Sequence, residues 1–115
     1  MNDEYIRKAV LIRVIDGDTI EALVDLGYRT YHKHLLRLDG IDTPEHSAGA
    51  EATAAIKEIL GDAEYVWVRS RKNPDKYGRW LVTVYVEQDG SLIDVNQALL
   101  DRGVAVPYHG GRKPA

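Results

Sequence analysis

The stretch Arg37-Leu38-Asp39-Gly40-Ile41-Asp42-Thr43-Pro44-Glu45 decides the fold, because a strand pattern ends in it at a glycine. Pro44 has a fixed φ and favours an extended conformation at Thr43, so the loop is short and stiff. We expect this loop to hold Asp42, the carbonyl of Thr43 and Glu45 in one place. Such oxygen ligands suit a hard cation such as Ca²⁺, and the arginine's planar fork matches two phosphate oxygens. The same residues also make an ordinary turn after a strand.

Three strands are expected before this stretch. Residues 7–15 are rich in β-branched side chains and are short enough to form a strand. Residues 19–26 return after Asp16-Gly17-Asp18, where Asp-Gly is a strong hairpin signal because glycine accepts a positive φ. A third strand is predicted over residues 29–38. The three strands form a meander that brings the stretch to one end of a sheet.

After Glu45 the periodicity of the apolar residues changes. Alanine-rich helical spacing predicts a helix over residues 50–60, and strand patterns follow at 64–69 and 80–86. A short helix is expected from a cap at Asp94 through residue 102. Five strands with a helix after the third predict a mainly β fold, a five-stranded Greek-key barrel of the OB type with two or three short helices. A sandwich would need about seven strands.

The 115 residues fit one domain with one modest core. We assign residues 1–108 to that domain and expect 109–115 to form a flexible tail. The chain has no cysteine, which excludes thiolate metal sites, and no apolar run that could cross a bilayer. Its first residues are acidic, unlike a signal peptide. We therefore expect a monomeric intracellular protein that does not engage membranes.

The formal net charge is −3 and the pI is near 5.8. Because dedicated nucleic-acid binders are usually basic, this balance counts against a large phosphate-tracking surface. A small site in which a bound metal supplies the positive charge is still compatible with it. If Asp18 and Asp42 lie at one end of the same sheet, they form such a site, since a cation relieves the repulsion between two carboxylates.

The segment Asp75-Lys76-Tyr77-Gly78-Arg79 joins the fourth and fifth strands. It is compatible with a charged, solvated loop. Alternatively, Arg79 is a second phosphate clamp, and Lys76 and Tyr77 contact a neighbouring phosphate. Two arginines and a cation would neutralise the charge that develops on a phosphoryl group during in-line displacement. Elsewhere, His32 and His34 are interpreted as surface histidines rather than metal ligands.

Three segments together resemble the motifs of a known family. Residues 16–19, 37–45 and 75–79 match, in order and spacing, those of the thermonucleases, which are staphylococcal-nuclease-like, calcium-dependent phosphodiesterases. The resemblance extends from Arg7 to about Tyr108. It implies an OB barrel with helices and a hydrolase that cleaves nucleic acid.

The resemblance implies roles for the residues around a bound Ca²⁺. Asp18, Asp42 and the Thr43 carbonyl would be the ligands, with Asp16 as a supporting carboxylate. Glu45 would orient or deprotonate the attacking water. These assignments apply only to the positions that match the family's motifs.

The resemblance also implies how a nucleotide would be held. Arg37 and Arg79 would bind the phosphate that is cleaved. Lys76 and Tyr77 would contact a terminal phosphate, and Tyr108 would line the nucleotide pocket. The sequence departs from the family in a shorter loop after residue 45 and in the lack of a basic C-terminal helix.

The function predicted from the sequence is calcium-dependent hydrolysis of DNA, with RNA left open as a substrate. The alternative is a non-catalytic OB module that binds single-stranded nucleic acid or a protein partner. Because the carboxylates and both arginines are all present, the sequence favours the enzyme.

Overall fold

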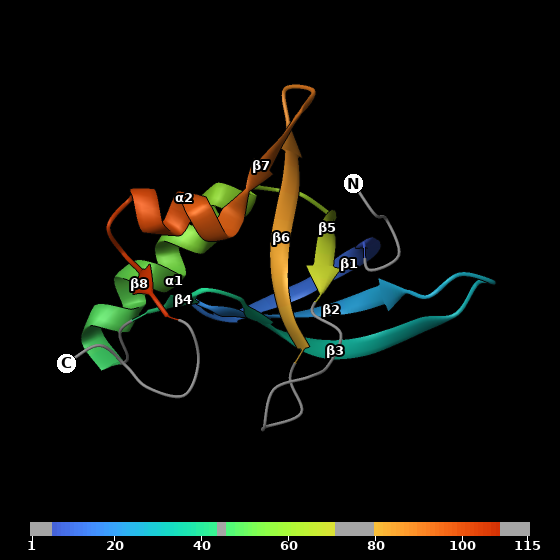
Figure 1. Ribbon diagram of the computed structural model, residues 1–115, viewed down its shortest axis with the longest axis horizontal. Helices are drawn as coiled ribbons and strands as arrows, with labels where there is room; N and C mark the ends of the chain where they lie inside the picture. Colours follow the sequence, from blue (N-terminus) through green and yellow to red (C-terminus); the bar gives the residue numbers. More distant parts are fainter. Residues whose placement is uncertain (1–5, 44–45, 71–79, 109–115) are drawn as a thin grey trace.

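The computed structural model describes residues 6–43, 46–70 and 80–108, with side chains from residue 49 onward in the middle range. The helices and strands are drawn in Figure 1. Their bounds are β1 Ile6–Asp16, β2 Thr19–Asp25, β3 Tyr31–Leu38, β4 Ile41–Asp42, α1 His46–Leu60, β5 Tyr65–Ser70, β6 Trp80–Gln88, β7 Ser91–Asp94, α2 Val95–Asp101 and β8 Val106–Pro107.

The fold is a closed barrel of five strands. The main sheet has the order β3-β2-β1-β5-β6-β7, and a parallel pairing of β3 with β6 closes it. β7 continues the sheet beyond β6 as a hairpin, and β4 pairs with β8 in a small second sheet. The predicted OB-type barrel with short helices is therefore confirmed. The three extra strands were missed because runs of two to four residues carry no readable alternation.

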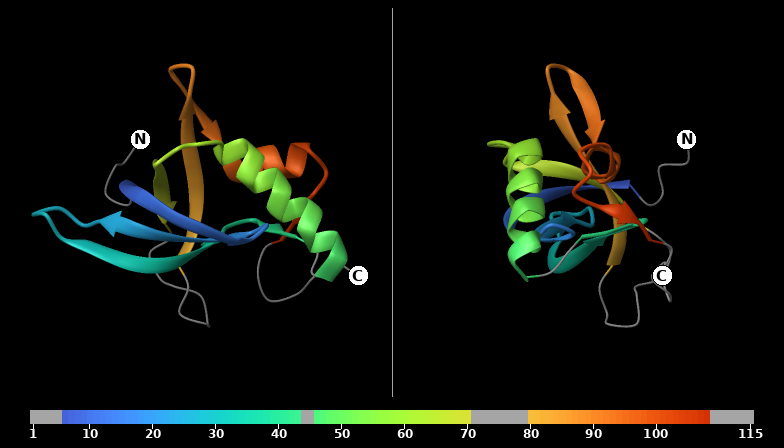
Figure 2. Two further views of the ribbon diagram at one scale, coloured as in Figure 1. Left: turned by 180° about the vertical axis from the view of Figure 1, so that it is seen from behind. Right: turned by 90° about the vertical axis from the view of Figure 1, so that its left-hand side faces the viewer.

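The two helices lie together at one end of the barrel. Figure 1 shows α1 and α2 on the side opposite the β2–β3 hairpin, which projects away from the barrel. The left view of Figure 2 shows α1 crossing in front of α2 at this end of the barrel. The helical stripe expected from the sequence is buried against the strands, as Ala52, Ala55, Ile56 and Ile59 show. α1 begins at His46, four residues before the predicted start, and ends at Leu60 before Gly61, whose φ is 59°.

The strands alternate as a half-buried sheet requires. On β5 and β6 the inward residues Val66, Val68, Val82, Val84 and Val86 are at most 2% exposed. On β3, Leu36 and Leu38 point into the core, which places Arg37 on the outer face of the barrel wall. Because side chains of β3 alternate between its two faces, the core lies on one face of this strand and the site described below lies on the other.

The barrel interior also holds a cavity of about 400 Å³ near the base of the projecting hairpin. Its described lining includes Val24, Leu36, Val68 and Val82 with His34 and Trp80. His32 and His34 thus face this cavity rather than open solvent alone. None of the predicted site residues is among its described lining. In the described part of the chain, no helix is long and apolar enough to span a membrane.

Candidate active site

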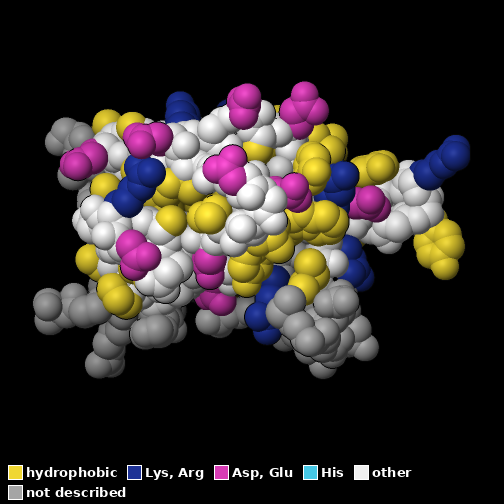
Figure 3. Space-filling view, turned by 90° about the horizontal axis from the view of Figure 1, so that it is seen from above, with side chains coloured by type: hydrophobic (Ala, Val, Ile, Leu, Met, Phe, Trp, Pro, Cys, Tyr) yellow, Lys and Arg dark blue, Asp and Glu magenta, His cyan; other side chains and the backbone are white. Residues whose placement is uncertain are grey.

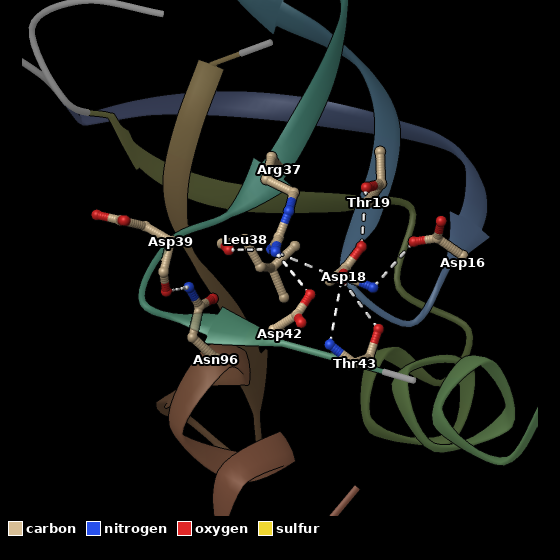
Figure 4. A network of polar contacts seen from close by, with 9 residues as sticks. All are labelled: Asp16, Asp18, Thr19, Arg37, Leu38, Asp39, Asp42, Thr43 and Asn96. Carbon is tan, nitrogen blue, oxygen red and sulfur yellow. Dashed lines mark hydrogen bonds and ion pairs between the residues drawn. The ribbon is translucent and has the colours of Figure 1, made fainter. Parts of the chain in front are cut away.

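Three elements bring the predicted acidic and basic residues together. Asp18 lies at the β1–β2 turn, Arg37 near the end of β3, and Asp42 in β4. Figure 4 shows these side chains converging on one another from the three elements. Two sequence-distant motifs, around residues 16–19 and 37–43, therefore form one site at the end of the barrel nearest the helices.

The guanidinium of Arg37 lies between the two carboxylates. Its Nη2 atom is 3.5 Å from Oδ2 of Asp18 and 3.3 Å from Oδ1 of Asp42. Its Nη1 atom donates to the carbonyl of Leu38 at 2.7 Å, and the side chain is only 8% exposed. Arg37 thus supplies a positive charge between the two carboxylates, in addition to any metal ion that they would bind.

Hydrogen bonds fix both carboxylate oxygens of Asp18. Oδ2 accepts from the backbone N–H of Thr43 at 3.3 Å and from its hydroxyl at 3.0 Å. Oδ1 accepts from the hydroxyl of Thr19 at 3.1 Å. Burial acts to raise the pKa of Asp18, but hydrogen bonding with Asp16, the charge of Arg37 and the bonds from Thr43 outweigh it. The net pKa of Asp18 is lowered, so this carboxylate is held ionised.

Asp16 supports the turn that carries Asp18. Its Oδ1 atom accepts from the backbone N–H of Asp18 at 3.1 Å. Asp16 keeps part of its surface in solvent, yet partial burial and then the side-chain hydrogen bond with Asp18 raise its pKa. The pKa values of the two neighbouring carboxyls are thus shifted in opposite directions, and Asp18 holds its charge more strongly than Asp16.

Gly17 is required because the turn packs closely against α1. The sequence pattern instead suggests a glycine with a positive φ. The φ of Gly17 is not positive, whereas that of Gly27 at the next turn is 86°. A Cβ at residue 17 would lie 2.6 Å from Cβ of Ala52 and 3.1 Å from Oγ1 of Thr43. The absent side chain lets the turn pack directly on α1 and places Asp18 beside Thr43.

Tyr108 joins the site through the small second sheet. Pairing of Ile41 with Pro107 brings the end of the described chain to β4, and the N–H of Tyr108 donates to the carbonyl of Gly40 at 2.9 Å. The Tyr108 ring centroid is 5.9 Å from Cζ of Arg37. A tyrosine at this position is therefore in cation–π range of the guanidinium.

Asn96 is a site-supporting residue that sequence reasoning missed. Its Oδ1 accepts from the N–H of Val84 at 3.0 Å, and its Nδ2 donates to the carbonyls of Val82 at 3.0 Å and Asp39 at 2.9 Å. The buried amide thus joins α2, β6 and the turn that leads into β4. An asparagine between Val95 and the apolar positions of a short helix was the available signal, since buried polar groups are kept only with partners.

Four predicted site residues lie outside the described residues. They are Glu45, Lys76, Tyr77 and Arg79, and their roles stay predictions. The described chain resumes at Trp80, and the next residue, Leu81, pairs with Arg37 across the parallel β3–β6 ladder. The start of β6 is thus a direct neighbour of the site.

The comparison with family sequence models supports this arrangement. The model described as "Staphylococcal nuclease homologue" matches residues 35–114, which is more than half of the chain. The chain belongs to the staphylococcal nuclease family. Arg37, Asp42 and Thr43 lie inside the matched range, and Asp18 meets them through the contacts above.

Curated members with similar sequences come from bacteria and an archaeon. "Protein ParB" of Escherichia coli is 35% identical over 109 residues, covering 87% of this chain and 58% of the relative. "Micrococcal nuclease" of Shigella flexneri is 32% identical over 111 residues, covering 90% and 60%. An uncharacterized protein of Methanocaldococcus jannaschii is 27% identical over 124 residues, covering 85% and 58%. The chain spans less than two thirds of the length of these relatives.

The residues present fit a hard divalent cation, as the nuclease family implies. Asp18 and Asp42 offer carboxylate oxygens on either side of one buried guanidinium, and the N–H and hydroxyl of Thr43 hold the Asp18 carboxylate in place. An all-oxygen donor set with no sulfur suits Ca²⁺ or Mg²⁺ rather than a thiophilic metal. Within residues 6–43, 46–70 and 80–108 no group of three or more His, Cys, Asp or Glu side chains is arranged as a metal site. Backbone oxygens or water would therefore complete the coordination.

Proposed function

We propose that this protein is a calcium-dependent nuclease that hydrolyses phosphodiester bonds of DNA, with RNA open as a second substrate. The observation that carries the proposal is the position of Arg37, with Asp18 and Asp42 each within 3.5 Å of Nη2. The buried guanidinium can bind a phosphate, and the two carboxylates beside it can bind a metal ion. The phosphate and the metal would then lie in one site. Membership of the staphylococcal nuclease family supports this chemistry.

In the proposed reaction the carboxylates of Asp18 and Asp42 hold the cation, with the Thr43 carbonyl as a further ligand. When bound, the cation supplies Lewis-acid polarisation of a phosphoryl oxygen. The chain's own contribution is a rigid frame for these groups. Thr19 and Thr43 fix both oxygens of Asp18, so this carboxylate needs little rearrangement before binding.

Arg37 is the proposed phosphate clamp. The carbonyl of Leu38 orients its guanidinium through Nη1, which leaves the planar fork in one orientation. N–H donors that are fixed before the reaction stabilise charge that develops on the equatorial oxygens of a phosphoryl group. Arg79 is proposed as the second clamp, and Glu45 as the group that handles the attacking water. Lys76, Tyr77 and Tyr108 are proposed to hold the nucleotide.

The test is a cleavage assay on labelled single- and double-stranded DNA and RNA. Each substrate is incubated with Ca²⁺, with Mg²⁺ and with excess chelator. We expect cleavage with Ca²⁺ and none with chelator. Activity that persists unchanged in chelator would contradict the metal-dependent mechanism, and binding of oligonucleotide without cleavage under all conditions would favour a non-catalytic OB module.

A further inference from the structure

The outer surface of β1, β5 and β6 carries a group of aromatic and basic side chains. In the antiparallel ladders, Trp67 pairs with Lys8 of β1 and with Tyr85 of β6. Because Val66, Val68 and Val84 point into the core, their neighbours on the same strands point outward. We call the set Lys8, Tyr65, Trp67, Arg69 and Tyr85 the outer aromatic face.

This face is open to solvent and its rings contact one another. Tyr65 is 38% exposed, Lys8 and Arg69 are exposed, and Trp67 and Tyr85 are partly exposed. The Tyr65 and Trp67 rings meet edge to face with centroids 6.4 Å apart. The Lys8 ammonium lies 3.9 Å from the centroid of Tyr65. The ammonium thus covers one face of the Tyr65 ring, and a base that stacks on that face would displace the lysine toward a phosphate.

The charges on this face differ from those of the whole chain. The formal net charge is −3, yet the outward positions that pair across the three strands are aliphatic, aromatic, hydroxyl or basic. They are Ile6, Lys8, Val10, Tyr65, Trp67, Arg69, Thr83 and Tyr85. Carboxylates begin at the β7 border of the face, where Asp94 pairs with Tyr85, and Glu87 follows one row further along β6. In Figure 3, hydrophobic side chains gather between the helices and the hairpin, with both acidic and basic side chains around them. Exposed rings with a lysine and an arginine among them suit an anionic, ring-containing partner.

We propose that the outer aromatic face binds single-stranded nucleic acid, with bases stacked on Tyr65, Trp67 and Tyr85. Lys8 and Arg69 would contact the phosphates between those bases. Every base has a π-face, so stacking on rings tolerates any sequence. Bases in a duplex are already paired and stacked on one another, and the face therefore selects single strands.

The face is connected to the active site along β6. Leu81 pairs with Arg37, and Thr83 and Tyr85 follow at the next outward positions of the same strand. Four residues of strand span about 13 Å, which is a few nucleotides of chain. A strand held at Arg37 can continue over β6 to the rings. This continuity rests on the proposed function, whereas binding to the face does not.

The binding experiment uses the whole protein in excess chelator, so that no cleavage occurs. Fluorescence anisotropy of a labelled thymidine oligonucleotide of about 12 nucleotides, within the usual site size of an OB fold, gives the affinity. We expect single-stranded oligonucleotide to bind more tightly than a duplex of equal length. Tyr65→Ala should weaken single-strand binding about tenfold. Lys8→Gln should reduce the slope of log affinity against log salt by about 0.7, the value for one phosphate contact on a single strand.

Two matched controls separate the face from general surface effects. Tyr28 is fully exposed on the β2–β3 hairpin, and Lys57 is exposed on α1. Tyr28→Ala and Lys57→Gln should leave affinity and salt slope unchanged. In a Trp80→Phe variant, Trp67 is the remaining one of the two tryptophans, and its fluorescence should be quenched by single strands and not by duplex. If that variant does not fold, the anisotropy series on the other variants still decides the question.

The outcomes distinguish this proposal from the proposed nuclease activity. Oligonucleotide binding that Tyr65→Ala and Lys8→Gln leave unchanged would overturn the outer aromatic face as a binding site, even if cleavage is intact. If Trp67 fluorescence changes with protein concentration and not with oligonucleotide, the outer aromatic face is a contact between two copies of the chain. The proposal of nucleic-acid binding would then be wrong. Binding through these residues by a protein that never cleaves would support the face and refute only the nuclease.

Discussion

The Nη2 atom of Arg37 lies 3.3 Å from Oδ1 of Asp42, so the proposed phosphate clamp is paired with a proposed metal ligand. The contact links phosphate binding by Arg37 to metal binding by Asp42, two roles that were assigned separately from the sequence. Because one guanidinium also faces Asp18 and the Leu38 carbonyl, its planar shape is required to serve all three partners. A lysine ammonium carries its three donors on a single nitrogen and cannot present them from two separate atoms as Nη1 and Nη2 do.

The first prediction is therefore that Arg37→Lys slows cleavage although it keeps the charge. Losing one preorganised donor to the transition state should cost about 3 kcal/mol, or roughly a hundredfold in rate. Single-turnover cleavage with saturating Ca²⁺ measures this. Arg102→Lys, at an exposed arginine after α2, is the matched control and should keep wild-type turnover. Wild-type turnover in Arg37→Lys would remove this arginine from the phosphate site.

The second prediction concerns Asp18 and pH. The lowered pKa of folded Asp18 means that its contribution to stability is present above the unfolded value near 3.8 and is lost as pH falls through the folded value. Asp18→Asn puts an amide N–H₂ among donors from Thr19, Thr43 and Arg37. Near neutral pH this should lower the free energy of unfolding by about 2–3 kcal/mol.

Urea denaturation of Asp18→Asn and wild type, in chelator and across acid pH, tests whether the stability contribution of Asp18 is lost at low pH. The gap between the two proteins should narrow as pH falls below 3.8, because Asp18 of the unfolded wild type then takes up a proton while folded Asp18, with its lowered pKa, stays charged to lower pH. Asp62→Asn, at an exposed carboxylate after α1, should change stability by less than about 0.5 kcal/mol. A gap that stays constant with pH would show that the charge of Asp18 does not stabilise the fold.

The third prediction follows from the packing of Gly17 on α1. Gly17→Ala introduces a Cβ 2.6 Å from Cβ of Ala52 and 3.1 Å from its backbone carbon, so the turn must shift. We expect a loss of about 1–3 kcal/mol in the free energy of unfolding and weaker metal binding. The double variant Gly17→Ala with Ala52→Gly should recover part of the loss relative to the sum of the single changes. Simple additivity of the two changes would rule out the contact.

The barrel was predictable because its signals are local. Alternation gave β1, β2, β3, β5 and β6 to within a few residues, and alanine spacing gave the buried stripe of α1. The sequence left open whether Asp18 and Asp42 meet at one end of the sheet, and in the structure both lie within 3.5 Å of Nη2 of Arg37. The sequence pattern could not show which side chains from distant segments come into contact. The guanidinium between the carboxylates and the close approach of Gly17 to Ala52 depend on contacts between segments tens of residues apart.

The fourth prediction tests a residue that local patterns did not reveal. Asn96→Ala leaves the N–H of Val84 and the carbonyl of Val82 without their buried partner. The free energy of unfolding should fall by about 2–3 kcal/mol, with reduced activity because the turn at Asp39 is released. Gln97→Ala, at the exposed neighbour, should lose well under 1 kcal/mol. Equal effects of the two changes in urea denaturation would show that the Asn96 amide has no special role.

The last prediction concerns Glu45, and it separates an enzyme from a binding module. The residue follows Asp42 by three positions in a sequence stiffened by proline, which is why it is proposed to handle the attacking water. Glu45→Gln keeps the size of the side chain and removes its basicity. If the proposal holds, nucleotide affinity is retained while single-turnover cleavage falls by about 10²-fold or more. Calorimetry and cleavage are measured on one sample, so a loss of both would assign Glu45 a structural role. Cleavage at the wild-type rate would take Glu45 out of the mechanism, whereas a wild-type protein that binds nucleotide and never cleaves would leave the OB module as the function.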